Sequence, residues 1–273
     1  MQDSMLQVYK GKNYRRAKTK NTSRVIAFDL DETLGSFVDL DLLWRTFMKH
    51  KITVNFNDLL DLYPEFLRYG IIHILEYLYQ KKTTGQCYKI YIYTNNQCDP
   101  SWTLMISDYF DYKLKTHDKL FDKIIYAFKI NNKPIELART THDKTYNDFI
   151  KCTLLPKTTE LCFVDNSEFD EMKKDRVYYI CPKSYYHHLT PNEIVQRLIE
   201  SNLLQNNTID INVLTKQLGI NRNYRITSPE LNATISHKIM YHIKEFFFFT
   251  NKKTRTKKFK LSVGKNTRKK RTY

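Results

Sequence analysis

The sequence predicts an α/β fold built on a doubly wound parallel sheet. Short apolar runs alternate with amphipathic helical segments, and this alternation is typical of a parallel sheet covered by helices on both faces. The predicted strands are residues 24–28, 88–93, 161–164 and 176–180. The first three runs end abruptly in acids, asparagines or a threonine. An open α/β sheet binds ligands at the carboxyl ends of its strands, so these polar clusters are expected to meet there.

Helical segments and two interruptions separate the predicted strands. Residues 71–78 precede the second strand, residues 146–151 precede the third, and residues 192–203 close the pattern. Residues 35 to about 67 and 97 to about 137 interrupt the alternation. We expect both to be small insertions above the sheet.

The two ends of the chain are basic, whereas its body is nearly neutral. Of the net charge of +16, residues 1–24 carry +6 and residues 252–273 carry +11, which leaves −1 between them. Such ends either bind polyanions weakly or serve nuclear import or solubility. The expected organisation is a basic tail over 1–23, the main α/β domain over 24–203, a helical extension over 204–250 with short helices at 211–218 and 229–248, and a basic disordered tail over 251–273.

The cysteine spacing and the length of the apolar runs indicate in which cellular compartment the chain is expected. The five cysteines are odd in number and widely spaced, without a Cys-x-x-Cys pair, which argues against a disulfide frame and a zinc knuckle. A reducing intracellular compartment is therefore expected. No run is long enough to span a bilayer, and the four phenylalanines at 246–249 are expected to end a buried helix or strand.

A short acidic motif follows the first predicted strand. Asp29, Asp31 and Thr33 are spaced two residues apart directly after the apolar run 24–28. A carboxylate can attack a phosphate and form an aspartyl-phosphate, and Asp29 is placed for that role. Asp31 is expected to protonate the leaving oxygen and later to activate water. Thr33 is expected to hold Asp31 by a hydrogen bond.

Polar residues near the other strands complete a phosphate site. Thr94 and Asn95 end the second strand, and Lys144 begins the helix before the third. We expect them to bind the phosphoryl oxygens and to neutralise their charge.

A cation is also required, because a phosphate and a carboxylate repel each other. Mg²⁺ prefers oxygen ligands and keeps several waters. The expected magnesium ligands are Asp29, the backbone carbonyl of Asp31, and Asp165 or Asn166.

Each of these signals has an ordinary alternative when it stands alone. Thr94 and its asparagines end a strand as turn residues do, Lys144 alone is a surface lysine, and Asp165-Asn166 is an ordinary turn. Asp39-Leu40-Asp41 repeats the acidic spacing, but no strand precedes it and no threonine follows, so it is interpreted as a loop or helix start. The order of the signals along the chain, each beside its own strand, favours one joint site.

These motifs resemble those of the haloacid dehalogenase superfamily over residues 24–190. Asp29-Leu30-Asp31-Glu32-Thr33-Leu34 most resembles the motif of phosphatases of the RNA polymerase II C-terminal domain and their small relatives. Asp165-Asn166-Ser167, and Tyr69-Gly70 with the helix after it, are similar to that group as well. The resemblance implies a phosphatase domain with Asp29 as nucleophile, Asp31 as acid and base, Thr94 and Lys144 as phosphate ligands, and Asp165 and Asn166 around Mg²⁺.

A second resemblance concerns the origin of the chain. The segments Arg139–Thr145 and Tyr186–Leu189 and the basic C-terminal end resemble uncharacterised proteins of large DNA viruses. This implies the cytoplasm or nucleus of a host cell, or a virion. His142 is either a loop residue, a second acid or a substrate contact. His187-His188 has no ligand spacing and is expected to be structural.

Three functions remain in competition. The leading one is a protein phosphatase acting on phosphoserine or phosphothreonine. A nucleotide or nucleic-acid 3′-phosphatase would give the basic ends a purpose. The third is a catalytically silent module that binds nucleic acid, although such a module would need neither Asp31 nor Lys144. None of the three involves a membrane.

Overall fold

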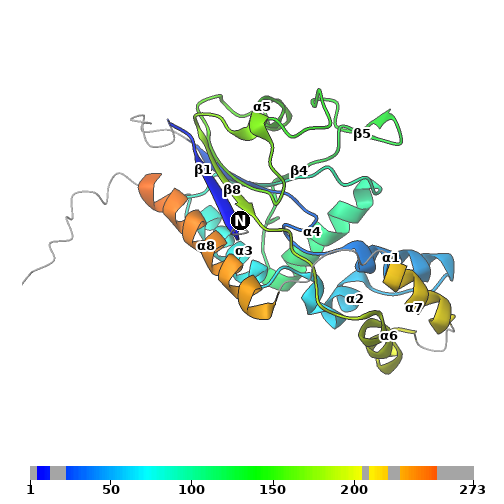
Figure 1. The fold of residues 1–273 in the computed structure, drawn as a ribbon. Coiled ribbons are helices and arrows are strands. Elements are labelled where there is room, and N and C mark those ends of the chain that lie inside the picture. Colours follow the sequence, from blue (N-terminus) through cyan, green and yellow to red (C-terminus); the bar gives the residue numbers. More distant parts are fainter. Residues whose placement is uncertain (1–4, 13–22, 205–208, 221–227, 251–273) are drawn as a thin grey trace, which may run out of the picture.

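The computed structural model describes residues 5–12, 23–204, 209–220 and 228–250. Its centre is a six-stranded sheet with the order β1-β8-β7-β2-β3-β4, drawn in Figure 1. The strands are β1 (Leu6–Lys10), β2 (Arg24–Phe28), β3 (Lys89–Tyr93), β4 (Lys123–Ile125), β7 (Glu160–Val164) and β8 (Val177–Pro182). All neighbours pair in parallel except β1, which runs antiparallel to β8. The predicted α/β class is confirmed, and the four predicted strands are β2, β3, β7 and β8.

Alternate side chains of each central strand enter two separate cores. Ile26 and Phe28 of β2 belong to one core, and Val25 and Ala27 to the other. The larger core is covered by α3 (Ile71–Thr83), α4 (Pro100–Leu114) and α8 (Pro229–Thr250), and the smaller one by α5 (Tyr146–Thr153). Because both faces of these strands are buried, their sequences are apolar throughout rather than alternating.

The helix that closes the predicted pattern is α6 (Pro191–Glu200). Thr190 and Glu193 form a reciprocal capping box at its start, and Pro191 takes its first turn. A short 3₁₀ turn, η3 (Asn202–Leu204), follows it. Local sequence therefore accounts for where this helix begins.

The first predicted insertion is helical. Residues 35–67 contain α1 (Val38–Lys49), α2 (Phe56–Leu62) and η1 (Pro64–Phe66). The acidic repeat Asp39-Leu40-Asp41 lies in the first turn of α1, as the helix-start interpretation predicted.

The second predicted insertion is wrong in extent. Within residues 97–137, α4 and β4 continue the alternation, and β4 pairs in parallel with β3. The segment outside the main sheet is a hairpin of β5 (Lys129–Ile130) and β6 (Lys133–Pro134). A three-residue edge strand with an exposed lysine gives too short a pattern to recognise.

Part of the predicted N-terminal tail is a β-strand. Leu6 and Val8 of β1 pack against the larger core, and Tyr9 packs against the smaller one. Residues 6–10 therefore form an edge strand, and the tail predicted over 1–23 is wrong for this segment. Residues 1–4 and 13–22, and the tail predicted over 251–273, lie outside the described residues.

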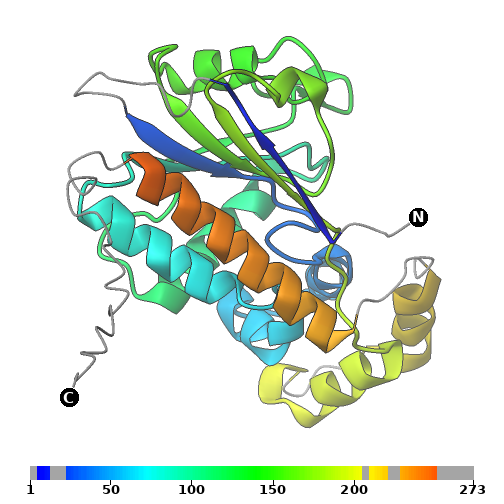
Figure 2. The same cartoon turned by 60° about the vertical axis from the view of Figure 1, so that its left-hand side comes forward.

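In the described residues of the C-terminal extension, 209–220 and 228–250, the structure has the helices α7 (Ile211–Ile220) and α8. Figure 2 shows α8 running beside α3. Gly70 at the start of α3 has φ +72°, and a Cβ there would lie 2.3 Å from the Ser236 hydroxyl of α8. Phe246 and Phe247 are buried, as expected for a helix end, whereas Phe248 is exposed.

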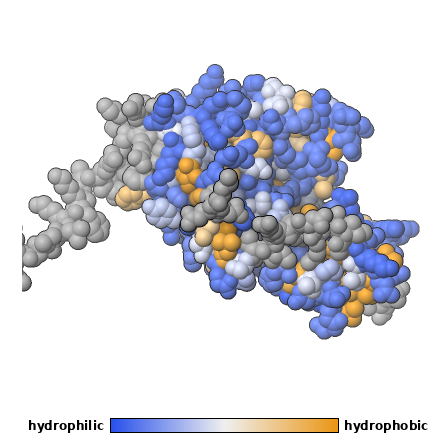
Figure 3. All heavy atoms as spheres, in the orientation of Figure 1, coloured by the Kyte–Doolittle hydropathy of each residue, from blue (hydrophilic) through white to orange (hydrophobic). Residues whose placement is uncertain are grey.

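The surface is mostly polar on the face drawn in Figure 3. Hydrophilic side chains cover most of this face, and apolar residues form small separate groups among them. Within the described ranges, no helix has the length and apolar character needed to cross a membrane.

Candidate active site

Three neighbouring strands bring the predicted site residues to one edge of the sheet. Phe28 of β2 pairs with Ile92 of β3 and with Val164 of β7, so the polar residues that follow these strands lie at the same edge. They surround a pocket of about 240 Å³. Its lining contains Asp29, Asp31, Glu32, Thr94, Asn95, Asn96, Lys144, Asp165, Asn166, Ser167 and Phe169. Every predicted site residue is therefore present in the lining except Thr33, which lies behind it.

Lys144 is the central cation of this pocket. Its Nζ donates to Oδ1 of Asp29 and, at 2.6 Å, to Oδ2 of Asp165, and its side chain is only 2% exposed. Thr145 caps the following helix α5, which fixes Lys144 just before the helix start. Burial alone would lower the pKa of Lys144, but the carboxylates of Asp165 and Asp29 outweigh it and the pKa is raised. The side chain is therefore a charged ammonium and not a solvated surface lysine.

Asp31 has the properties of a proton donor and acceptor. Asn96 Nδ2 donates a hydrogen bond of 2.7 Å to its Oδ2. Burial, together with the charge of neighbouring Asp29, raises the pKa of Asp31 to about 6. A carboxyl group with such a pKa can both release and accept a proton near neutral pH. From the sequence alone, Asn96 is expected only to be a turn residue, so this contact is a finding of the structure.

Thr33 does not hold Asp31 as predicted. Its hydroxyl donates to Oδ1 of Asn166 at 2.8 Å and accepts from the Asn166 backbone N–H at 3.0 Å. Asn166 also donates from Nδ2 to Ser184 at 3.0 Å. The contacts of Thr33 therefore orient Asn166, while Asn96 takes the role at Asp31 that was expected of Thr33. The spacing of the motif could not distinguish the two partners, since both lie at strand ends far away in the sequence.

Thr94 and Asn95 both present donors to the pocket. The Thr94 hydroxyl oxygen accepts from the Asn96 backbone N–H at 2.9 Å, so its own O–H can donate to a ligand. Oδ1 of Asn95 accepts from Arg139 at 2.7 Å, which leaves the amide NH₂ as its donor. Together with Lys144, these groups suit a ligand rich in acceptor oxygens.

Arg139 is a residue that the sequence did not single out. It is 2% exposed and donates to five acceptors. These are the backbone carbonyls of Thr94, Tyr126, His142 and Asp143 and the side chain of Asn95. Arg139 thereby ties the loop after β3 to the loop that carries Lys144. A single arginine in a polar loop is ordinarily solvated, so its only available signal was its place five residues before Lys144.

The oxygen donors of the pocket suit a hard cation. Two carboxylates and the Asn166 amide oxygen lie together, and Oδ1 of Asn166 keeps one lone pair beyond its bond from Thr33. In the described ranges, no group of three or more His, Cys, Asp or Glu side chains is arranged to hold a metal. Mg²⁺ binds through one or two carboxylates and completes its shell with water and phosphate oxygens, so the donors present fit it.

The histidines considered in the sequence analysis lie outside this pocket. His187 is buried, and its Nε2 lies 3.0 Å from Oδ2 of Asp39, which agrees with a structural role. His142 is exposed, and its ring contacts Phe128 with centroids 5.4 Å apart.

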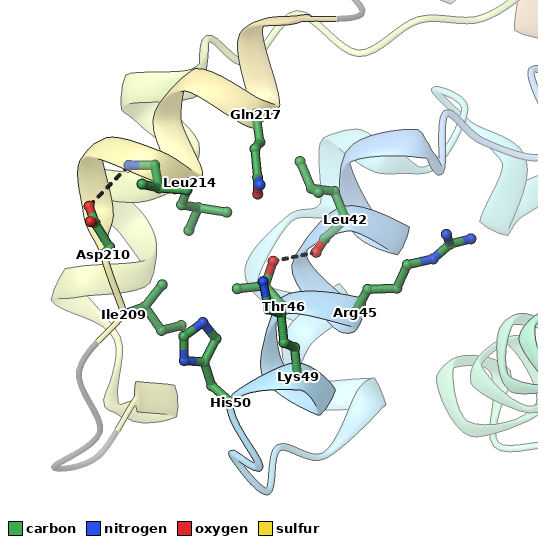
Figure 4. Close-up of a pocket in the computed structure, with 10 residues that line it drawn as sticks. Leu42, Arg45, Thr46, Lys49, His50, Ile209, Asp210, Leu214 and Gln217 are labelled. Atoms are coloured by element: carbon green, nitrogen blue, oxygen red, sulfur yellow. Dashed lines mark hydrogen bonds between the residues drawn. The ribbon is translucent and has the colours of Figure 1, made fainter.

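A further pocket of about 200 Å³ lies between α1 and α7. In Figure 4, His50 of the α1 end faces Ile209 and Asp210, while Arg45 points away from α7. Asp210 accepts from the Val213 N–H at 3.1 Å and so caps α7. None of the predicted site residues lines this pocket.

No protein-family model, curated protein or solved structure matches this chain.

Proposed function

We propose that this chain is a magnesium-dependent phosphomonoester hydrolase that works through an aspartyl-phosphate on Asp29. The observation that carries this proposal is the buried Lys144 ammonium between Asp29 and Asp165, beside the donors of Thr94. Phosphoryl transfer requires positive charge and fixed donors around the phosphoryl oxygens, together with a positioned nucleophile. A binding module would not need a nucleophile and an acid side by side.

The proposed reaction has two steps. Asp29 attacks the phosphorus, and the bond to the leaving oxygen breaks as Asp31 gives that oxygen its proton. Asp31 then removes a proton from water, which attacks the phosphorus and releases inorganic phosphate and the Asp29 carboxylate. Thr94, Asn95 and Lys144 donate to the phosphoryl oxygens throughout.

Mg²⁺ would be held by Asp29, Asp165, Asn166 and the backbone carbonyl of Asp31. It would supply the charge that allows a phosphate dianion to approach the Asp29 carboxylate. The Asn166 side chain is already oriented for this role by Thr33.

The proposed substrate is a phosphoserine or phosphothreonine of a protein. The support for this class is the resemblance of the Asp29 motif to phosphatases of the RNA polymerase II C-terminal domain within the haloacid dehalogenase superfamily. The strongly basic chain ends favour a second candidate, a nucleic-acid 3′-phosphate. Turnover of a phosphoserine peptide compared with a 3′-phosphorylated oligonucleotide separates the two.

The activity itself is tested with an aryl phosphate. Purified protein should release phosphate in Mg²⁺ and stop when EDTA is added. Metal-independent hydrolysis, or no hydrolysis of aryl phosphate, peptide or oligonucleotide, would refute the proposal.

A further inference from the structure

A second pocket, of about 370 Å³, lies at the start of α3. It is larger than the pocket around Lys144 and is separate from it in lining. Its walls come from the loop before α3, from α4, from the loop after β8 and from the start of α8. Leu67, Ile71, Tyr109 and Tyr185 contribute apolar and aromatic surface. A concave, mainly apolar pocket of this volume is the usual form of a small-molecule site.

The same pocket is lined by a buried cation, Arg68. The residue is 3% exposed, and its Nε donates to the Thr33 carbonyl at 2.6 Å. Nη2 donates to the carbonyls of Glu32 and, at 3.0 Å, Lys183. The Tyr185 ring lies against the guanidinium, 5.4 Å from its carbon. The cation is thus held in a fixed orientation by backbone oxygens and by an aromatic face.

This arrangement leaves part of the guanidinium unused. Among the residues that the structure describes, Nη1 has no hydrogen-bond partner and no carboxylate forms an ion pair with Arg68. Burial lowers the pKa of Arg68 to about 10, so the group is still charged at neutral pH. Among the described residues, the Glu32 carboxylate attracts the guanidinium without a hydrogen bond or ion pair to it, and the hydrogen bonds of Arg68 go to neutral carbonyls. A buried charge held in this way is costly, and an anion brought to Nη1 offsets part of that cost.

The other charges of the pocket favour an anion as well. Glu65 is already engaged by both Nη atoms of Arg197, at 2.8 and 2.7 Å. Lys113 adds a second cation to the lining, although it pairs with Asp61 at 2.6 Å. The lining thus combines an apolar surface with one buried cation that, among the described residues, forms no ion pair.

We propose that this pocket binds a small aromatic monocarboxylate, with the carboxylate on Nη1 of Arg68 and the ring between Tyr109 and Tyr185. A guanidinium recognises a carboxylate through directed, charge-assisted hydrogen bonds, which a neutral ligand cannot reproduce. An apolar ring fits the remaining walls.

The site also adjoins the loop after β2. Arg68 donates hydrogen bonds to the carbonyls of Glu32 and Thr33. Glu32 has a left-handed φ of 59°, and these hydrogen bonds stabilise that conformation. A ligand on Arg68 would therefore contact the residue that fixes the loop beyond Asp31. Any effect on turnover rests on the proposed function, whereas binding does not.

Calorimetric titration of the full chain with 2-naphthoate and with its neutral isostere 2-naphthamide tests the proposal. We expect the acid to bind at least tenfold more tightly than the amide, because only the acid pairs with Arg68. Excess inorganic phosphate should not displace it, which separates this site from the pocket around Lys144.

Substitution of Arg68 would remove buried hydrogen bonds and could unfold the protein. The test therefore changes another residue of the pocket lining. Ile72→Trp places a larger side chain in the lining and should weaken naphthoate binding at least tenfold. Ile199→Trp, on exposed α6 surface outside the pocket, should leave it unchanged. Equal affinity for acid and amide, displacement by phosphate, no binding of either compound, or full binding by Ile72→Trp would each overturn the proposal.

Discussion

The ammonium group of Lys144 bridges the carboxylates of Asp29 and Asp165, although the three residues come from three different segments of the chain. Asp29 follows β2, Asp165 follows β7, and Lys144 precedes α5. The contact makes the site a buried charge network and not a loose group of polar side chains. It follows that each of the three residues contributes to stability as well as to the proposed chemistry.

Removal of the Lys144 charge should lower both the stability of the fold and the proposed phosphatase activity. Lys144→Met leaves two buried carboxylates without their cation, so the free energy of unfolding in EDTA should fall by about 3 kcal/mol. Phosphate release should be lost with it. Denaturant titration measures the first effect. Lys151→Met on the exposed side of α5 is the matched control and should change stability by less than about 1 kcal/mol.

Thr33→Val should act through Asn166 and not through Asp31. The substitution keeps the shape of the side chain but removes both hydrogen bonds to Asn166. We expect the Mg²⁺ concentration for half-maximal turnover to rise by about tenfold, the usual cost of losing an outer contact to a metal ligand. An unchanged Mg²⁺ requirement would show that Asn166 does not serve the metal.

Arg139→Met should separate the loop after β3 from the loop that carries Lys144, the two loops proposed to bind phosphate. It leaves five acceptors without their donor, so we expect a loss of stability of about 3 kcal/mol. If the protein stays folded, the affinity for inorganic phosphate should fall. Arg139→Lys should recover less than half of that affinity, because one ammonium cannot reach all five acceptors. Recovery of the full affinity by lysine would mean that charge alone matters here.

The docking of β1 should depend on pH through Glu245. Lys10 of β1 donates to both Glu245 oxygens, at 2.7 and 2.9 Å, and the Tyr178 hydroxyl donates at 2.6 Å. Burial would raise the pKa of Glu245, but these bonds outweigh it and lower the pKa below its ordinary value of 4.5. Because the folded-state pKa is the lower one, the stabilisation is complete at neutral pH and is lost as pH falls through it.

The free energies of unfolding of Glu245→Gln and of the wild-type protein, measured at several pH values, test this pH dependence. At pH 7 the variant should be less stable by about 1 kcal/mol. The difference should shrink as the pH falls below about 4.5, because the unfolded carboxylate takes up a proton there and the folded one does so only at lower pH. A difference that stayed constant with pH would exclude an ionised Glu245 as its source.

Burial explains which strands could be predicted from the sequence. β2, β3, β7 and β8 are apolar on both sides, so their runs are unmistakable. β1 and β4 lie at the two edges of the sheet, and their exposed lysines, Lys10 and Lys123, resemble loop residues. Edge strands depend on a neighbour that the local sequence does not reveal.

In the site, too, the sequence predicts residues that follow a recognisable strand but not contacts between distant residues. Asp29, Thr94 and Asp165 could be placed because each follows a recognisable strand. The partner of Thr33 could not, since Asn166 is 133 positions away in the chain. Arg68 and Arg139 were missed because their burial arises only when distant backbone carbonyls converge on them.

In the proposed reaction, Asp29 carries the phosphoryl group during turnover. Wild-type protein turning over an aryl phosphate in Mg²⁺ can be quenched in acid, digested, and analysed by mass spectrometry. We expect the peptide that contains Asp29 to carry one added phosphoryl group, and Asp29→Asn to remain folded with neither that peptide nor turnover. Turnover by Asp29→Asn, or a phosphoryl group found on another residue, would contradict the account.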